Sequence, residues 1–188
     1  DGHRPAGGAV AGDCFDPGRE RRGQRTGGSR HSPKQSPGPR AIHSGELRGA
    51  PAASLQKMQR AGNPWGLPEQ DRLAWAEDIN VPTVQDNPDF DVLYWVGCSA
   101  AYDRRTMKVA RAVAQLLHRA EVNFAVLGPE ERCTGESARR MGDEFLFQEL
   151  AATNIETFTR HGVKKIVTHC PHCLNSLRQD YPQFDGHY

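Results

Sequence analysis

The second half of the chain alternates short apolar runs with longer segments of helical periodicity. The apolar runs are rich in β-branched and aromatic residues, which is typical of buried strands. The expected strands are 92–96, 124–127 and 163–168, and the expected helices are 103–121, 137–161 and a segment that begins at 171. Strands separated by helices of this length pair in parallel through right-handed crossovers. We therefore expect an α/β fold, a small Rossmann-like parallel sheet.

Local signals at the helix ends agree with this order. Asp103 is a residue type that caps helix N-termini, and apolar residues after it recur three and four positions apart. Gly162 suits the end of the 137–161 helix. Pro171 suits a first helical position, where its missing N–H costs nothing.

The composition divides the chain into three parts. Residues 1–57 are dominated by Gly, Pro, Arg, Ser and Ala, and hold Cys14 and a single aromatic side chain. Such a segment buries too little apolar surface to offset the entropy of ordering, so we expect a disordered tail. Residues 58–90 are expected to form a helical and irregular arm, anchored by Trp65, Leu73 and Trp75. Residues 91–188 are expected to form a cysteine-rich domain, truncated at its C-terminus.

Charge and hydropathy exclude several functional classes. Residues 1–56 carry nine Lys and Arg against five Asp and Glu, and the rest of the chain carries fifteen against eighteen. Neither part shows the clustered basic face of a nucleic-acid-binding protein. No apolar run approaches the roughly 20 residues of a membrane-spanning helix, and no signal peptide opens the chain. Because the chain begins with Asp1 rather than Met, we expect a fragment.

Four cysteines follow the three expected strands. Cys98 follows the first strand, Cys133 lies in the loop after the second, Cys170 ends the third, and Cys173 is one turn into the next helix. Parallel strands point the same way, so these positions share the carboxyl edge of the sheet, where α/β folds bind ligands. We therefore expect the four thiols to converge.

Four cysteines without a secretory signal indicate metal or redox chemistry rather than disulfides. A helix N-terminus lowers the pKa of nearby thiols and favours thiolates, as at Cys170 and Cys173. Four thiolates suit zinc and iron–sulfur clusters equally well in number. Structural zinc usually gathers two close pairs, whereas here one pair joins two single cysteines, which favours a cluster.

The spacing of these residues resembles the cysteine-rich CCG domain. After Cys98 come 34 residues, then Cys133-Thr134-Gly135, then 35 residues from Thr134 to Cys170-Pro171-His172-Cys173. This domain occurs in heterodisulfide reductase-related iron–sulfur oxidoreductases, including the iron–sulfur subunits of glycolate oxidase and of anaerobic glycerol-3-phosphate dehydrogenase. The resemblance covers about residues 63–188.

The resemblance implies an electron-transfer module. Thr134 replaces the second cysteine of the family pattern, so four ligands remain and an ordinary [4Fe–4S] cluster is expected rather than the noncubane cluster of some members. The implied partners are a flavin- or ferredoxin-type redox subunit and a second cysteine-rich domain of the full-length protein. The acceptor would be a quinone or a disulfide. The implied location is cytoplasmic, peripheral to the inner face of the membrane through these partners.

Two other functions are compatible with the residues. A zinc-stabilised binding domain would use the same ligands without redox chemistry. A thiol–disulfide oxidoreductase would use the Cys-Pro-His-Cys pair, but it would leave Cys98 and Cys133 without a role. His169 and His172 are interpreted as partly exposed polar residues, with N–H···S contacts to the cluster as the alternative. Gly97 and Gly135 are expected to let the backbone approach the cluster closely.

Overall fold

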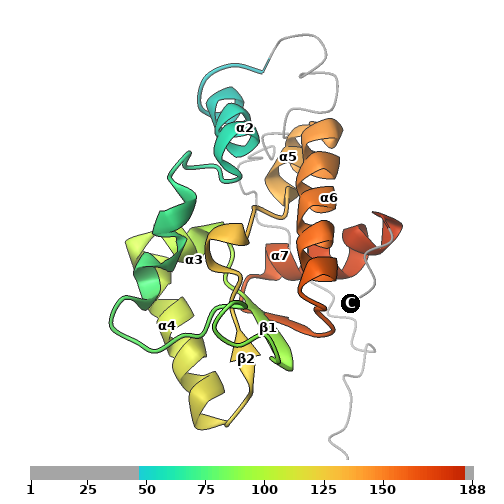
Figure 1. Cartoon of the computed structure of the whole chain (residues 1–188). Helices are drawn as coiled ribbons and strands as arrows, with labels where there is room; N and C mark the ends of the chain where they lie inside the picture. The colour runs from blue at the N-terminus through green and yellow to red at the C-terminus, as the bar shows by residue number, and fades with distance from the viewer. Residues whose placement is uncertain (1–46, 185–188) are drawn as a thin grey trace, which may run out of the picture. The chain divides into compact units, whose positions relative to one another are not determined.

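The computed structural model describes residues 47–184 (Figure 1), so residues 1–46 of the expected tail 1–57 lie outside the described residues. The helices are α2 (Ala50–Ala61), α3 (Cys98–Tyr102), α4 (Arg104–Arg119), α5 (Glu136–Met141), α6 (Glu144–Arg160) and α7 (Pro171–Asn175). The strands are β1 (Val92–Trp95), β2 (Phe124–Ala125) and β3 (Ile166–Thr168). Short 3₁₀ segments are η1 (Glu69–Ala76), η2 (Gly128–Glu130) and η4 (Tyr181–Phe184), and a π-helical turn, η3 (Ser176–Asp180), follows α7.

The three strands form one parallel sheet in the order β2–β1–β3. The register pairs Leu93 with Ala125 on one side and with Ile166 on the other. A bridge between Thr83 and Val126 extends the β2 edge. The predicted α/β class with a small parallel sheet is therefore confirmed.

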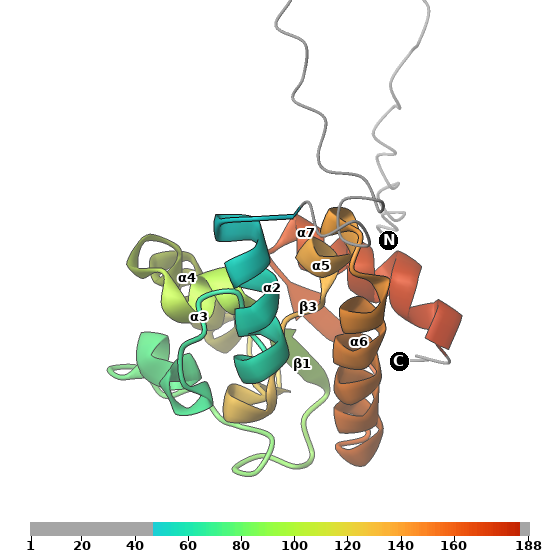
Figure 2. The ribbon, with the colours of Figure 1, turned by 90° about the horizontal axis from the view of Figure 1, so that it is seen from above.

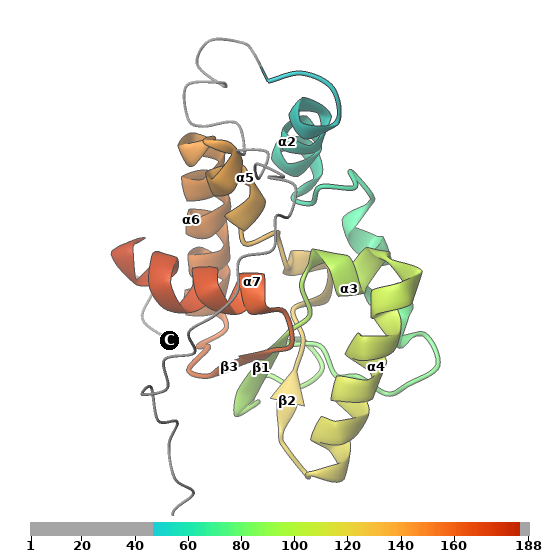
Figure 3. The ribbon, with the colours of Figure 1, turned by 180° about the vertical axis from the view of Figure 1, so that it is seen from behind.

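Both faces of the sheet are covered, which explains why β1 is apolar at successive positions. Leu93 and Trp95 face a cluster that includes side chains of α6, whereas Tyr94 and Val96 face a second cluster with side chains of α4. Figures 1 and 3 show α4 and α6 on opposite sides of the strands. β1 is thus the buried centre of the domain.

The N-terminal boundary expected at residue 57 falls inside a helix. Helix α2 buries Leu55 and Met58, which are three positions apart on one helix face. Gly62 ends the helix in the left-handed conformation, and its N–H donates to the Met58 carbonyl. In Figure 2, α2 lies between α3 and α6. The prediction that disorder extends to residue 57 was wrong. Leu55 and Met58 pack against neighbouring elements, and this packing stabilises a helix in a segment whose composition alone predicts disorder.

The single helix expected over 137–161 is two helices. Gly142 ends α5 in the left-handed conformation with φ 92°, and the Asp143 side chain caps α6 by accepting from the N–H of Leu146. Asp103 caps α4 as predicted, accepting from the N–H of Arg105. The short helix α3, which begins at Cys98 itself, was not expected.

Of the three predicted anchors of the arm, only Trp75 is fully buried. Its exposed fraction is 1%, whereas Trp65 remains 39% exposed and lies beside Tyr102, with ring centroids 6.2 Å apart. The Nε of Arg111 on α4 donates to the carbonyl of Trp75 at 2.6 Å. Leu73 is partly buried in the cluster around Trp75. The arm is therefore part of the core.

Replacement of Met58 by alanine tests whether α2 belongs to the domain. Because Met58 is fully buried, we expect the substitution to lower the free energy of unfolding by about 2–5 kcal/mol. The measurement is chemical denaturation followed by circular dichroism. The control is Gln56→Ala on the exposed face of the same helix, which should change stability by no more than about 0.5 kcal/mol. Equal small effects would show that α2 does not contribute to the core.

Within residues 47–184, no helix is both long enough and apolar enough to cross a membrane.

Candidate metal centre

The four cysteines lie beyond the carboxyl ends of the strands. Cys98 begins α3 directly after β1, and Cys133 lies between η2 and α5, after β2. Figure 3 shows β3 leading into α7, where Cys170 is the N-cap and Cys173 the third helical residue. The parallel topology thus brings together segments that are more than 30 residues apart in the chain.

One cavity of about 280 Å³ is lined by all four cysteines. It exceeds the roughly 30 Å³ that one water molecule occupies in the liquid, so it has room for more than a single ion. Its wall also includes residues from the arm, from the α3 turn and from the loop before α5, among them Trp65, Gly97, Thr134, His169 and His172. Cys98, Cys133 and Cys173 are each 8% exposed, and all four thiols are free.

The thiols lie in the cavity as two hydrogen-bonded pairs. Cys133 donates to Cys98, which lowers the pKa of Cys98 and raises that of Cys133, and burial raises the latter further. In the second pair, the hydrogen bond from Cys173 is the main reason that the pKa of Cys170 falls to about 5. The N–H groups of Cys173 and His172 at the start of α7 add to this lowering. One thiol of each pair is therefore predisposed to the thiolate form that metals bind.

Within residues 47–184, the thiols do not form a ready-made site for a single metal ion. Among residues 47–184, no three His, Cys, Asp or Glu side chains are grouped so as to hold one. A tetrahedral zinc site with Zn–S bonds of about 2.3 Å needs sulfur atoms within roughly 4 Å of one another. Four thiols that line one larger cavity are compatible with a polynuclear group.

A buried ion pair supports the Cys98 turn. The Nη1 of Arg72 lies 2.9 Å from the Oε1 of Glu131, and both side chains are almost fully buried. Glu131 also accepts from the backbone N–H groups of Val96, at 3.1 Å, and Gly97, at 2.8 Å. The Nη2 of Arg72 donates to the Sγ of Cys98 at 3.1 Å. The carboxylate therefore fixes the backbone before Cys98, and the guanidinium contacts its sulfur.

The charge states of this pair follow from its partners. Burial lowers the pKa of Arg72, but the negative charges of Cys98 and Glu131 raise it by more, so the guanidinium stays protonated. Burial raises the pKa of Glu131, and the opposing effects of Arg72 and the N–H groups of Val96 and Gly97 only partly offset this. The pair is thus a permanent cation beside a carboxyl group that accepts hydrogen bonds from three donors.

The other cysteine loop is held from both sides. The N–H of Cys133 donates to the carbonyl of Gly62, at the end of α2, at 2.7 Å. The carbonyl of Cys133 accepts from the Nδ2 of the buried Asn154 on α6 at 3.1 Å. The hydroxyl of Tyr181 donates to the carbonyl of Thr134 at 3.2 Å. The loop is therefore fixed by α2, α6 and the segment after α7.

The histidines and glycines near the cysteines differ in role. The Nδ1 of His169 lies 3.0 Å from the hydroxyl of Tyr94, and burial lowers the pKa of His169. His172 is exposed, and its side chain hydrogen-bonds Cys170. A Cβ on Gly97 would lie 3.2 Å from the Sγ of Cys173, so Gly97 does allow close approach to the site. The backbone of Gly135 also lies close to the site, because its N–H donates to Cys133 and lowers the pKa of that thiol, whereas a Cβ on Gly135 would meet Phe147.

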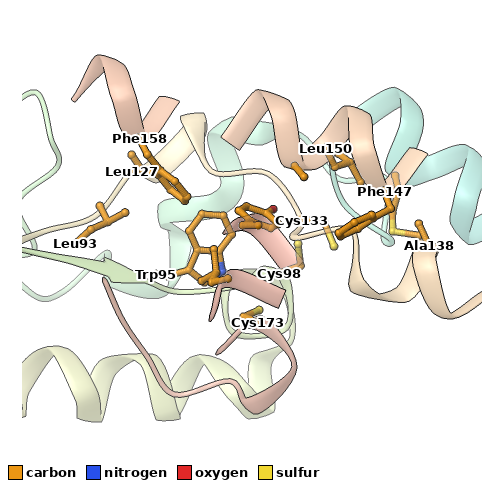
Figure 4. Close-up of a cluster of buried hydrophobic side chains, with 14 of the residues drawn as sticks. Leu93, Trp95, Cys98, Leu127, Cys133, Ala138, Phe147, Leu150, Phe158 and Cys173 are labelled. Carbon is orange, nitrogen blue, oxygen red and sulfur yellow. The ribbon is translucent and has the colours of Figure 1, made fainter. Parts of the chain in front are cut away.

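Sequence reasoning missed Arg72, Glu131 and the indole of Trp95. Within residues 47–184, the buried Nε1 of Trp95 makes no hydrogen bond of standard geometry, but it approaches Cys173 and lowers the pKa of that thiol against the larger raising effects of Cys170 and burial. Figure 4 shows Trp95 next to the group formed by Cys98, Cys133 and Cys173. The one usable signal was Glu131, a carboxylate two positions before Cys133. Arg72 had none, since it lies 59 positions from Glu131 and 26 from Cys98.

Comparison with known proteins agrees with the cysteine pattern. Residues 92–178 match the family model described as a cysteine-rich domain, CCG. The chain is 44% identical to the probable iron-sulfur-binding oxidoreductase FadF of Bacillus subtilis (strain 168) over 138 residues, which is 70% of this chain and 20% of that protein. It is 38% identical to the EtfAB:quinone oxidoreductase of Syntrophomonas wolfei over 149 residues, 77% of this chain and 21% of that protein.

A third relative is one of the subunits of the dihydromethanophenazine:CoB–CoM heterodisulfide reductase of Methanosarcina barkeri. The identity is 32% over 127 residues, which is 66% of this chain and 30% of that protein. The chain thus spans about a fifth of the length of the first two relatives. No solved structure is significantly similar to it.

Proposed function

Since residues 92–178 are a cysteine-rich domain of the CCG family, we propose that the chain is an electron-transfer module with one [4Fe–4S] cluster. The proposed ligands are Cys98, Cys133, Cys170 and Cys173. The observation that carries the proposal is that all four thiols line one cavity at the carboxyl edge of the sheet. The name of the Bacillus subtilis relative, an iron-sulfur-binding oxidoreductase, supports the choice of metal.

The residues present fit such a cluster. Four thiolates are the ligand set of a [4Fe–4S] centre, and three of the four cysteines are 8% exposed. The buried Nε1 of Trp95 makes no hydrogen bond of standard geometry in the described part of the chain, but it is close enough to Cys173 to contribute to lowering the pKa of that thiol. A sulfur atom that carries more negative charge would accept from it, as sulfurs of iron–sulfur centres do.

The protein residues supply the environment of the cluster. When bound, the cluster takes up and releases one electron at a time. Glu131 holds the backbone of the Cys98 turn, and Asn154 holds the Cys133 loop. Trp65 and Thr134 form part of the wall and limit access of water. Any catalysis would depend on the cluster or on a partner subunit.

The proposed partners follow from the relatives. The module passes electrons between a flavin- or ferredoxin-type partner subunit and a quinone or disulfide acceptor. Support comes from relatives named for a quinone and for a heterodisulfide. A second cysteine-rich domain of the longer protein is a further expected neighbour. We place the module in the cytoplasm, where thiols stay reduced, at the inner face of the membrane through its partners.

Metal analysis of anaerobically purified protein tests the proposal. We expect iron and acid-labile sulfide in near-equal amounts, close to four of each per chain as the [4Fe–4S] formula requires. Zinc without sulfide would refute the iron–sulfur assignment and support a zinc-stabilised domain. Iron without sulfide would refute it as well.

A dithiol oxidoreductase is the second candidate because Cys170 has the electronic character of an attacking thiol. Its pKa of about 5 and the raised pKa of Cys173 are typical of Cys-x-x-Cys pairs. Metal-free protein that reduces a model disulfide, and loses this activity in a Cys170→Ser variant, would favour the second candidate. Unchanged disulfide reduction in a Cys98→Ser variant would show that the activity needs only the Cys170 and Cys173 pair.

A further inference from the structure

The arm, which lies outside the matched family region, contributes the buried cation Arg72, and Arg72 contacts the proposed ligand Cys98. Arg72 belongs to η1, whereas the family match begins at residue 92. The Nη2 of Arg72 lies 3.1 Å from the Sγ of Cys98. We propose that Arg72 is a positioning residue that raises the reduction potential of the centre through this contact. The inference rests on the proposed iron–sulfur function.

The guanidinium is held in one orientation by three groups. Its Nη1 binds Glu131 at 2.9 Å, its Nη2 binds the Cys98 sulfur, and its carbon lies 5.4 Å from the centre of the Tyr102 ring. Arg72 is 3% exposed and Glu131 is 2% exposed. Water therefore screens neither the cation nor its contact with the sulfur.

The ion pair with Glu131 leaves one nitrogen of the Arg72 guanidinium available for another contact. Both of its oxygens accept backbone N–H groups, from Val96 and from Gly97, in addition to the contact with Arg72. The Nη2 of Arg72 is therefore free to donate to the sulfur of Cys98. A buried ion pair contributes little to stability over an apolar pair of similar size, so a purely structural role would not require the contact with Cys98.

The effect on the potential has a definite sign. Reduction adds an electron to a group that already bears the negative charge of four thiolates. A fixed positive charge and an N–H···S bond stabilise the reduced form more than the oxidised form, especially at low local dielectric constant. Arginine also stays protonated at every accessible pH. Arg72 therefore raises the potential, and its removal lowers it.

The test is an anaerobic redox titration followed by electron paramagnetic resonance of the reduced centre. In an Arg72→Met variant, we expect the one-electron equilibrium to shift at least about tenfold towards the oxidised form, a potential about 59 mV lower. Arg72→Lys should shift less, because an ammonium keeps the charge but does not span both Cys98 and Glu131. The control is Arg111→Met, which removes another contact between arm and domain without touching a cysteine and should leave the potential unchanged.

The outcomes separate this inference from the proposed function. Wild-type protein without iron and sulfide would overturn both. A loaded Arg72→Met variant with the wild-type potential would overturn this inference alone. If the Arg72→Met variant holds no cluster, the reduction potential of a Glu131→Gln variant tests the proposal in its place. That variant keeps the guanidinium at Cys98 and removes a negative charge, so its potential should rise, and a value at or below the wild type would refute the proposal.

Discussion

Replacement of Cys133 by serine is expected to remove most of the iron and sulfide from the protein. The thiol is fixed in place, because its backbone N–H binds Gly62 and its carbonyl binds Asn154. A serine hydroxyl in that position is a hard, protonated group that does not replace a thiolate ligand. The loss should exceed the roughly 10–100-fold decrease in affinity that removal of an outer-shell partner causes. Iron and sulfide per chain, with the visible absorption of the cluster, provide the measurement.

The chain offers a matched control for this variant. Cys14→Ser changes the one cysteine outside the proposed ligand set, and it should leave the iron and sulfide content unchanged. Near-equal loading of Cys133→Ser and wild type would remove Cys133 from the ligand set. Circular dichroism of both variants without metal would show whether the fold itself has been lost.

Replacement of Gly135 by alanine is expected to lower the free energy of unfolding by about 2–5 kcal/mol. Gly135 has φ 79°, which costs an L-residue about 1–2 kcal/mol. The added Cβ would lie 2.9 Å from the Cδ2 of Phe147 and 3.2 Å from its Cα. Phe147 is fully buried, so it cannot move away, and overpacking of this kind costs about 1–3 kcal/mol more. Denaturant unfolding of the metal-free protein would measure the difference.

Gly162→Ala separates the two contributions. Gly162 also has a positive φ, 61°, but nothing lies within 4 Å of its added Cβ. It should therefore lose only the backbone contribution of about 1–2 kcal/mol. Equal losses at both positions would mean that Phe147 yields and that the packing around the Cys133 loop is looser than the structure shows.

The positions of the strands along the chain and most helix starts could be predicted from local patterns. The apolar run at β1 and the helix starts at Asp103 and Pro171 reflect interactions within a few residues. The split between α5 and α6 was missed because apolar residues continue across Gly142, and the left-handed turn there depends on packing as well as residue type. Helix α2 was missed because its two buried side chains need α6 and its neighbours as partners.

The candidate site was predictable to the extent that topology determines it. Parallel strands share a carboxyl edge, so cysteines placed just after them are expected on one side of the sheet. The structure accordingly has them line one cavity. The contacts between arm and ligands were not predictable, because the Arg72 to Glu131 and Gly62 to Cys133 contacts join residues far apart with no periodic spacing between them.

The sequence by itself therefore determined the parallel α/β class, the four cysteines on its carboxyl edge and the family to which residues 92–178 belong. These follow from side-chain periodicity and motif spacing, which are short-range properties of the chain. Only the tertiary structure decided that the arm is part of the site, and that Arg72 donates to the sulfur of Cys98. Such a contact arises when two distant segments exclude water from the same small volume, where a buried charge must find its partners.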